Sequence, residues 1–214
     1  MAICIWLDAM SRDKLADRLN AAIQIRRKYA AFFDCPDKKL KEWDVVCELL
    51  RSMHASGDCR YLQKVESVHD VWPDCVIRDS AGVQVGVEIT EFVDQNSVEM
   101  SERGMNVYRE WSDQAVREKI SQILRDKDRK AYHGGLYGKA ILVIHTDEVE
   151  LRSFRLFPIL NASVFPRPEN IDEAYLLCSY EPTLVAGVPD DLPDDAPLDD
   201  DPNPYPYARL NFEK

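Results

Sequence analysis

Apolar residues recur at helical spacing in two segments near the start of the chain. In residues 11–33 the recurring side chains are Leu15, Leu19, Ile23 and Tyr29. In residues 38–53 they are Trp43, Val46, Leu50 and Met53. One apolar stripe on an otherwise polar segment is typical of a helix that packs on a core. We therefore predict two amphipathic helices, the second of which ends at Ser56-Gly57-Asp58.

The pattern then changes to short apolar runs, which predict strands at residues 60–68, 74–78 and 83–92. Asp79-Ser80-Ala81-Gly82 has the composition of a tight turn. The second and third of these strands are therefore expected to form an antiparallel hairpin.

Helical and apolar segments alternate in the next part of the chain. Residues 97–131 predict a long helical stretch, broken near Gly104, whose clearest piece runs from Trp111 to Ala131. After a loop at 133–138, residues 140–144 form a continuous apolar run, typical of a buried central strand. A helix at 149–161 and a strand at 174–180 follow.

This order predicts an α/β fold with a mixed sheet flanked by helices. We expect a single domain over residues 1–185, with its core at about 38–147 and an additional helix before it. Residues 186–214 are rich in Pro and Asp and predict an irregular acidic tail. Within that tail, residues 205–212 are expected to dock back on the domain as an edge segment.

Charge is distributed unevenly along the chain. The formal net charge is −11, but seven aspartates and no basic residue lie between Asp190 and Asp201, which leaves −4 for the remainder. This balance disfavours tight non-specific binding to nucleic acid and is compatible with a locally basic cleft.

Cysteine spacing and hydropathy exclude two other classes of protein. The six cysteines form no CxxC pair, which argues against a structural zinc site and favours reduced thiols. No apolar run approaches the roughly 18 residues that span a bilayer, and the first residues do not resemble a secretion signal. We expect a cytoplasmic protein with no membrane partner.

Two carboxylates are the strongest candidates for chemistry. Asp74 begins one strand of the predicted hairpin, and Glu88 lies on the other. Because strand side chains alternate, Val85, Val87 and Ile89 should share one face while Glu88 emerges on the other. Together the two acids could hold Mg²⁺, a hard cation that prefers oxygen ligands. The alternative is a turn aspartate and a solvated strand glutamate.

Pro73-Asp74, the hairpin and Glu88-x-Thr90 resemble the PD-(D/E)xK restriction-endonuclease-like superfamily over roughly residues 38–147. The resemblance implies an αβββαβ core that presents the two acids to Mg²⁺, for which Mn²⁺ can substitute. It also implies that the backbone carbonyl of Ile89 is a further metal ligand.

The chain departs from that family at Thr90, where the family has a lysine. The family tolerates a lysine that reaches the site from a neighbouring helix instead. Lys127 is our candidate, because it lies at helical spacing with a predicted buried stripe, and Lys130 at the edge of that stripe is the reserve. The stripe consists of Val116, Ile120, Ile123, Leu124 and Ala131. Alternatively, Lys127 packs its stem inward and extends its head into water.

Members of the superfamily often add an acid from the first core helix. Glu42 shares a helix face with Val46, Leu49 and Met53, whereas Glu48 does not. We therefore choose Glu42 as the supporting acid. The alternative is a glutamate near a helix start, favoured by the helix dipole.

Four other features favour structural roles. His69 reads as a loop residue, and Trp72 as a core residue rather than a base-stacking platform. His145 ends the central strand, where sites on α/β sheets gather, but Thr146 or Asp147 reads better as a helix N-cap. The basic residues of 117–130 alternate with acids and read as a solvated helix face.

These interpretations predict a hydrolase that cuts phosphodiester bonds in nucleic acid, most simply DNA, with Asp74, Glu88, Lys127 and Glu42 as its catalytic set. The resemblance also implies a homodimer. The alternative is an inactive restriction-like fold that acts as a regulatory module and binds protein or nucleic acid. In that case the acidic tail would face a basic protein partner or screen the protein's own cleft.

Overall fold

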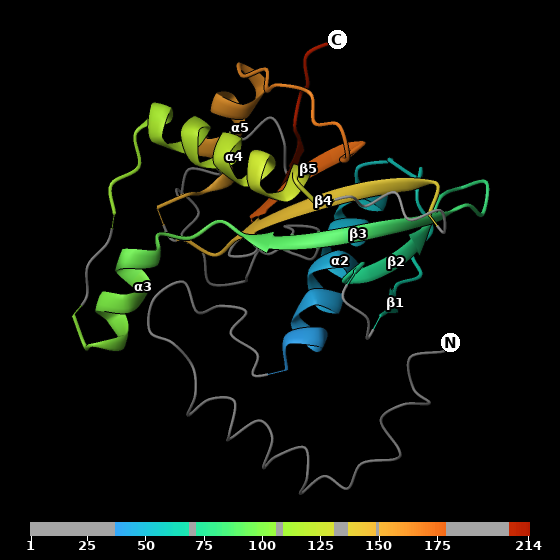
Figure 1. The fold of residues 1–214 in the computed structure, drawn as a ribbon, viewed down its shortest axis with the longest axis horizontal. Helices are drawn as coiled ribbons and strands as arrows, with labels where there is room; N and C mark the ends of the chain where they lie inside the picture. Colours follow the sequence, from blue (N-terminus) through green and yellow to red (C-terminus); the bar gives the residue numbers. More distant parts are fainter. Residues whose placement is uncertain (1–36, 69–71, 106–108, 131–136, 149, 179–205) are drawn as a thin grey trace, which may run out of the picture.

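The structure is a computed structural model that describes residues 37–68, 72–105, 109–130, 137–148, 150–178 and 206–214 (Figure 1). The predicted helix at 11–33 and the acidic run at 190–201 lie outside the described residues. The described helices are α2 (Lys38–Ala55), α3 (Gln95–Glu102), α4 (Asp113–Asp128) and α5 (Ser153–Asn161). The described strands are β1 (Glu66–Ser67), β2 (Cys75–Arg78), β3 (Gln84–Glu91), β4 (Lys139–Thr146), β5 (Glu173–Cys178) and β6 (Tyr207–Arg209).

The six strands form one mixed sheet in chain order, β1-β2-β3-β4-β5-β6. β1, β2 and β3 pair antiparallel, β3, β4 and β5 pair parallel, and β6 lies antiparallel at the far edge. The two parallel steps are bridged by helices, α3 and α4 before β4 and α5 before β5. The predicted α/β fold with a mixed sheet is confirmed.

The hairpin between β2 and β3 closes through the side chain of Asp79. Its Oδ1 accepts the backbone N–H of Ala81 at 2.9 Å and that of Val83 at 2.8 Å. Gly82 adopts φ 84°, a conformation that residues with a Cβ rarely adopt. The turn chemistry recognised in the sequence therefore sets the register of this hairpin.

Helices cover both faces of the sheet, with α4 and α5 on one face and α2 on the other (Figure 1). The core beneath α4 and α5 includes Val116, Ile120, Ile123, Leu124, Leu142, Ile144 and Leu176. The core beneath α2 includes Val46, Leu50, Met53, Val85, Val87, Ile89 and Val143. The predicted apolar face of β3 and the predicted stripe of α4 are confirmed, apart from Ala131, which lies outside the described residues.

Three predictions about local structure are wrong in part. Of the strand predicted at 60–68, only β1 pairs as a strand, while Tyr61 makes an isolated bridge with Asp79. Trp43 does not join the buried stripe of α2, because its side chain is exposed and its indole N–H donates to the Val65 carbonyl at 3.3 Å. The predicted helix at 149–161 begins only at Ser153.

The expected break in the long helical stretch is observed. α3 ends at Glu102, Gly104 adopts φ 82°, and α4 begins at Asp113. In the part of the chain that the structure describes, no helix is long and apolar enough to cross a membrane.

A buried acid joins three strands and the segment that follows α2. Glu173, at the start of β5, is 7% exposed and accepts the hydroxyl of Tyr175. Arg60 contacts its carboxylate at 3.1 Å, Arg209 at 3.5 Å and Lys139 at 3.7 Å. Burial alone would raise the pKa of Glu173, but the Tyr175 hydroxyl and the three cations outweigh it and hold that pKa below its ordinary 4.5.

This lowered pKa predicts acid-sensitive stability. The stabilisation by ionised Glu173 is complete above the unfolded-state pKa near 4.5 and is lost as the pH falls through the lower folded-state pKa. We expect Glu173→Gln to lower the unfolding free energy at pH 7 by about 1–3 kcal/mol. It should also flatten the fall in stability below pH 4.5, measured by urea unfolding across pH. The exposed Glu169→Gln is the control, and equal acid sensitivity in wild type and Glu173→Gln would contradict the prediction.

Candidate functional site

The hairpin places Asp74 and Glu88 opposite one another. Cys75 pairs with Val87 in the antiparallel register, so the next position outward sets Asp74 against Glu88. The backbone N–H of Asp74 donates to the Val87 carbonyl at 3.1 Å, which holds Asp74 on the ladder just before β2 begins. Two acids that are fourteen residues apart in sequence therefore meet as cross-strand neighbours.

A hydrogen bond to the backbone fixes the carboxylate of Asp74. Its Oδ2 accepts the N–H of Ile89 at 2.9 Å. The side chain thus supplies a hydrogen bond to β3 at the point where the backbone pairing of β2 ends. Its side chain is 13% exposed, and Oδ1 is left facing Lys39, 3.8 Å from that ammonium. This oxygen is therefore available for a further ligand.

Glu88 points toward α4 and meets two lysines. Its Oε1 accepts Lys127 Nζ at 2.7 Å and Lys130 Nζ at 2.9 Å, and its side chain is only 6% exposed. Lys130 lies one turn beyond Lys127, and its N–H donates to the Lys127 carbonyl at 3.1 Å, so both ammonium groups leave the same end of α4. Both the first lysine candidate and the reserve thus reach the carboxylate, and Lys127 is the more buried of the two.

Glu42 lies in the first turns of α2, which covers the opposite face of the sheet from α4, and it is joined to Asp74 through Lys39. It is 5% exposed, and its two oxygens contact Lys38 at 3.2 Å and Lys39 at 3.0 Å. Because Lys39 also faces Asp74, it joins the acid of the helix to the acid of the hairpin. Lys39 was missed in the sequence, although its position one turn before Glu42 is a usable signal.

The pKa of Asp74 reflects the charges of both other acids. Burial is the largest cause that raises the pKa of Asp74 above its ordinary 3.8, and the charges of Glu88 and Glu42 raise it further. The Ile89 amide and Lys39 oppose this rise without cancelling it. The three carboxylates repel one another, and the ammonium groups of Lys38, Lys39, Lys127 and Lys130 offset that repulsion.

Cys75 lies beside these acids but is unsuited to nucleophilic chemistry. It is fully buried, and burial, with Asp74 and Glu42 adding to it, raises the pKa of its thiol to about 12. The thiolate is the reactive form of cysteine, so this thiol is inert at neutral pH.

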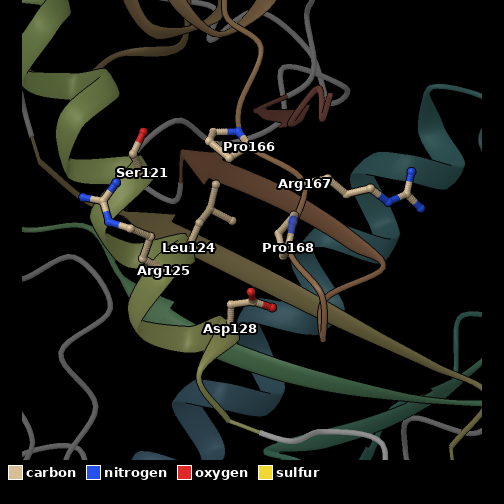
Figure 2. Close-up of a pocket in the computed structure, with 7 residues that line it drawn as sticks. All are labelled: Ser121, Leu124, Arg125, Asp128, Pro166, Arg167 and Pro168. Carbon is tan, nitrogen blue, oxygen red and sulfur yellow. The ribbon is translucent and has the colours of Figure 1, made fainter. Parts of the chain in front are cut away.

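The C-terminal end of α4 is anchored to the loop before β5. The carboxylate of Asp128 accepts the backbone N–H of Asn170 at 2.7 Å and that of Glu169 at 3.1 Å. Figure 2 shows Asp128 and Leu124 on α4 beside Pro168. These three residues help to line a hollow of about 70 Å³. Since Asp128 directly follows Lys127, this anchor also fixes the backbone position from which the Lys127 side chain extends.

The remaining candidate residues have structural roles or lie outside the described residues. His69 is outside the described residues. Trp72 is half-buried against the core and meets Tyr137 edge to face, with ring centroids 5.1 Å apart. The N-cap prediction for Thr146 and Asp147 is wrong, because α5 begins only at Ser153 and both residues are buried at the end of β4.

Asp74 and Glu88 offer carboxylate oxygens, the ligand type that Mg²⁺ prefers. Among the described residues, no group of three or more His, Cys, Asp or Glu side chains is arranged to hold a metal ion. Mg²⁺, however, is usually bound through one or two carboxylates, with water and substrate phosphate completing its octahedron. Among the described residues, Asp74 Oδ1 forms an ion pair only with Lys39, at 3.8 Å, and no donor hydrogen-bonds to Glu88 Oε2. The role of the Ile89 carbonyl stays a prediction.

A scan against family models, a search of curated proteins and a search of solved structures each return no significant match for the chain. The function is therefore argued from the geometry of Asp74, Glu88, Glu42 and their lysines.

The shared carboxylate predicts that Lys127 and Lys130 compensate for one another. We expect Lys127→Met or Lys130→Met alone to lower the unfolding free energy by about 1 kcal/mol or less, because Glu88 keeps one ammonium. The double variant leaves a buried carboxylate unpaired and should lose about 3 kcal/mol, more than the sum of the singles. Urea unfolding of the four proteins measures this coupling, and strict additivity would show that the lysines do not share Glu88.

Proposed function

We propose that this protein is a metal-dependent phosphodiesterase with a restriction-endonuclease-like core, acting on nucleic acid and most simply on DNA. The observation that carries the proposal is the contact of Lys127 with Glu88, opposite Asp74 on the hairpin. That contact supplies a lysine to Glu88 although Thr90 stands at the family's usual lysine position.

The order and pairing of the elements support this proposal. α2 precedes the antiparallel β1, β2 and β3, and α4 leads to β4, which pairs parallel with β3. This order is compatible with the αβββαβ core that the sequence resemblance implies, with α3 inserted before α4. The acids also come from the expected elements: Asp74 directly precedes β2, Glu88 lies on β3 and Glu42 on α2.

In this proposal each residue of the site has a distinct role. Asp74 and Glu88 would hold Mg²⁺ or Mn²⁺, with the Ile89 carbonyl as a third ligand. When bound, that ion lowers the pKa of water and neutralises charge on the phosphodiester. Lys127 would orient the attacking water and shield the charge that develops on the phosphate. Glu42 completes the acidic set through Lys39, which faces both it and Asp74.

A second candidate function is a binding or regulatory module that has lost catalysis. It is favoured by the ion pairs themselves, because lysines already contact Glu42, Asp74 and Glu88. A carboxylate neutralised by protein ammonium groups needs no metal for its stability. Thr90 in place of lysine is compatible with this alternative as well.

Substitution of either hairpin acid tests the proposed catalysis. We expect Asp74→Asn and Glu88→Gln each to reduce Mg²⁺-dependent cleavage of DNA at least a thousandfold, because each removes a charged metal ligand. Glu91→Gln is the matched control, because Glu91 is an acid of the same strand that alternation places on the opposite face from Glu88. The measurement is single-turnover cleavage, with circular dichroism to verify folding. Wild-type rates in both folded variants would refute the catalytic roles.

Thermal melting in Mg²⁺ or Mn²⁺ separates the two candidate functions. A cation that binds only the folded protein stabilises it by about 2.7 kcal/mol at a hundred times its Kd. We expect the melting temperature of wild type to rise with either cation, and that of Asp74→Asn to rise far less. No rise in wild type at millimolar cation would favour the non-catalytic module.

A further inference from the structure

Lys39 is the one described lysine that contacts two of the three clustered acids. Its Nζ lies 3.0 Å from Glu42 Oε2 and 3.8 Å from Asp74 Oδ1. Lys127 and Lys130, in contrast, both contact Glu88. The ammonium of Lys39 is thus the positive charge that lies between the acid of α2 and the acid of the hairpin.

The position of Lys39 is more enclosed than that of its neighbour on α2. The side chain of Lys39 is 31% exposed, whereas that of Lys38 is 82% exposed. Lys38 contacts Glu42 Oε1 at 3.2 Å, and no contact with Asp74 is present. Two adjacent lysines therefore pair with the same glutamate, but only one of them also faces the candidate metal ligand.

We propose that Lys39 occupies the cation position beside Asp74 Oδ1, so that a divalent cation binds there only by displacing the Lys39 ammonium. This inference rests on the proposed function and names the residue that sets the cation affinity of that site. The other oxygen of Asp74, Oδ2, is held by the Ile89 amide. Oδ1 is therefore the oxygen that an incoming ion would use, and it is the oxygen that Lys39 faces.

Charge balance gives the direction of the effect. With Lys39 in place, the ion must compete with a tethered positive charge that lies within 4 Å of its ligand. Without that ammonium, Asp74 keeps its neighbours Glu88 and Glu42 with less compensation, so the local potential becomes more negative. Removal of the Lys39 charge should therefore tighten cation binding, whereas removal of an ordinary supporting residue would weaken it.

The test measures Mn²⁺ binding directly, through the paramagnetic resonance signal of the free ion, with no substrate present. We expect Lys39→Met to lower the Kd for Mn²⁺ about tenfold relative to wild type. Lys39→Arg keeps the charge and should bind like wild type. Lys38→Met is the matched control, because it removes a contact with Glu42 but none with Asp74, and it should change the Kd less than twofold.

The possible outcomes separate this inference from the proposed function. Tighter binding in Lys39→Met, lost again in Lys39→Met combined with Asp74→Asn, would establish the competition at Asp74. Equal Mn²⁺ affinity in wild type, Lys39→Met and Lys39→Arg would overturn the role of Lys39 and leave the metal site standing. Weaker binding in folded Lys39→Met would overturn it as well. No Mn²⁺ binding in any of the proteins would overturn both the inference and the proposed metal-dependent function.

Discussion

The buried carboxylate of Glu88 is the constraint around which this site is organised. An ionised acid that is almost excluded from water needs a nearby cation, because an unpaired buried charge is strongly destabilising. α4 supplies two ammonium groups from its C-terminal end, and both reach the same oxygen. The position of α4 on the sheet is therefore tied to an acid on β3, and the contact joins the two elements that a catalytic site would have to combine.

The rest of the arrangement keeps that contact and its neighbours in place. Asp128 fixes the end of α4 to the loop before β5, and the Asp79 turn sets Asp74 against Glu88. The cost of this arrangement is visible at Asp74, where burial and two nearby acids raise the pKa of the carboxyl. Concentrated like charge opposes folding, and the ammonium groups of Lys39, Lys127 and Lys130 offset that repulsion.

Much of this architecture could be predicted from the sequence because the local signals were strong. The apolar alternation of Val85, Val87 and Ile89 defined the buried face of β3, and that in turn placed Glu88 on the side of α4. The helical stripe of α4 then brought Lys127 within reach of it. These predictions depend only on the periodicity of side chains along strands and helices, and the structure has that periodicity.

The features that could not be predicted depend on tertiary contacts. Trp43 fits the apolar stripe of α2 by spacing, yet its indole N–H binds the Val65 carbonyl at the surface. Residues 60–68 have the composition of a strand, but only Glu66 and Ser67 find a partner in β2. The bridging position of Lys39 requires the packing of α2 against the hairpin, which no local pattern encodes.

The central claim is that Asp74 and Glu88 form one cation site beneath the lysines of α4. A crystal structure of the protein soaked in Mn²⁺, with anomalous scattering to locate the ion, tests this claim most directly. The account predicts a single strong peak about 2.1 Å from a carboxylate oxygen of each of the two acids. A peak bound to other residues, or two well-ordered carboxylates that hold no ion at saturating Mn²⁺, would contradict it.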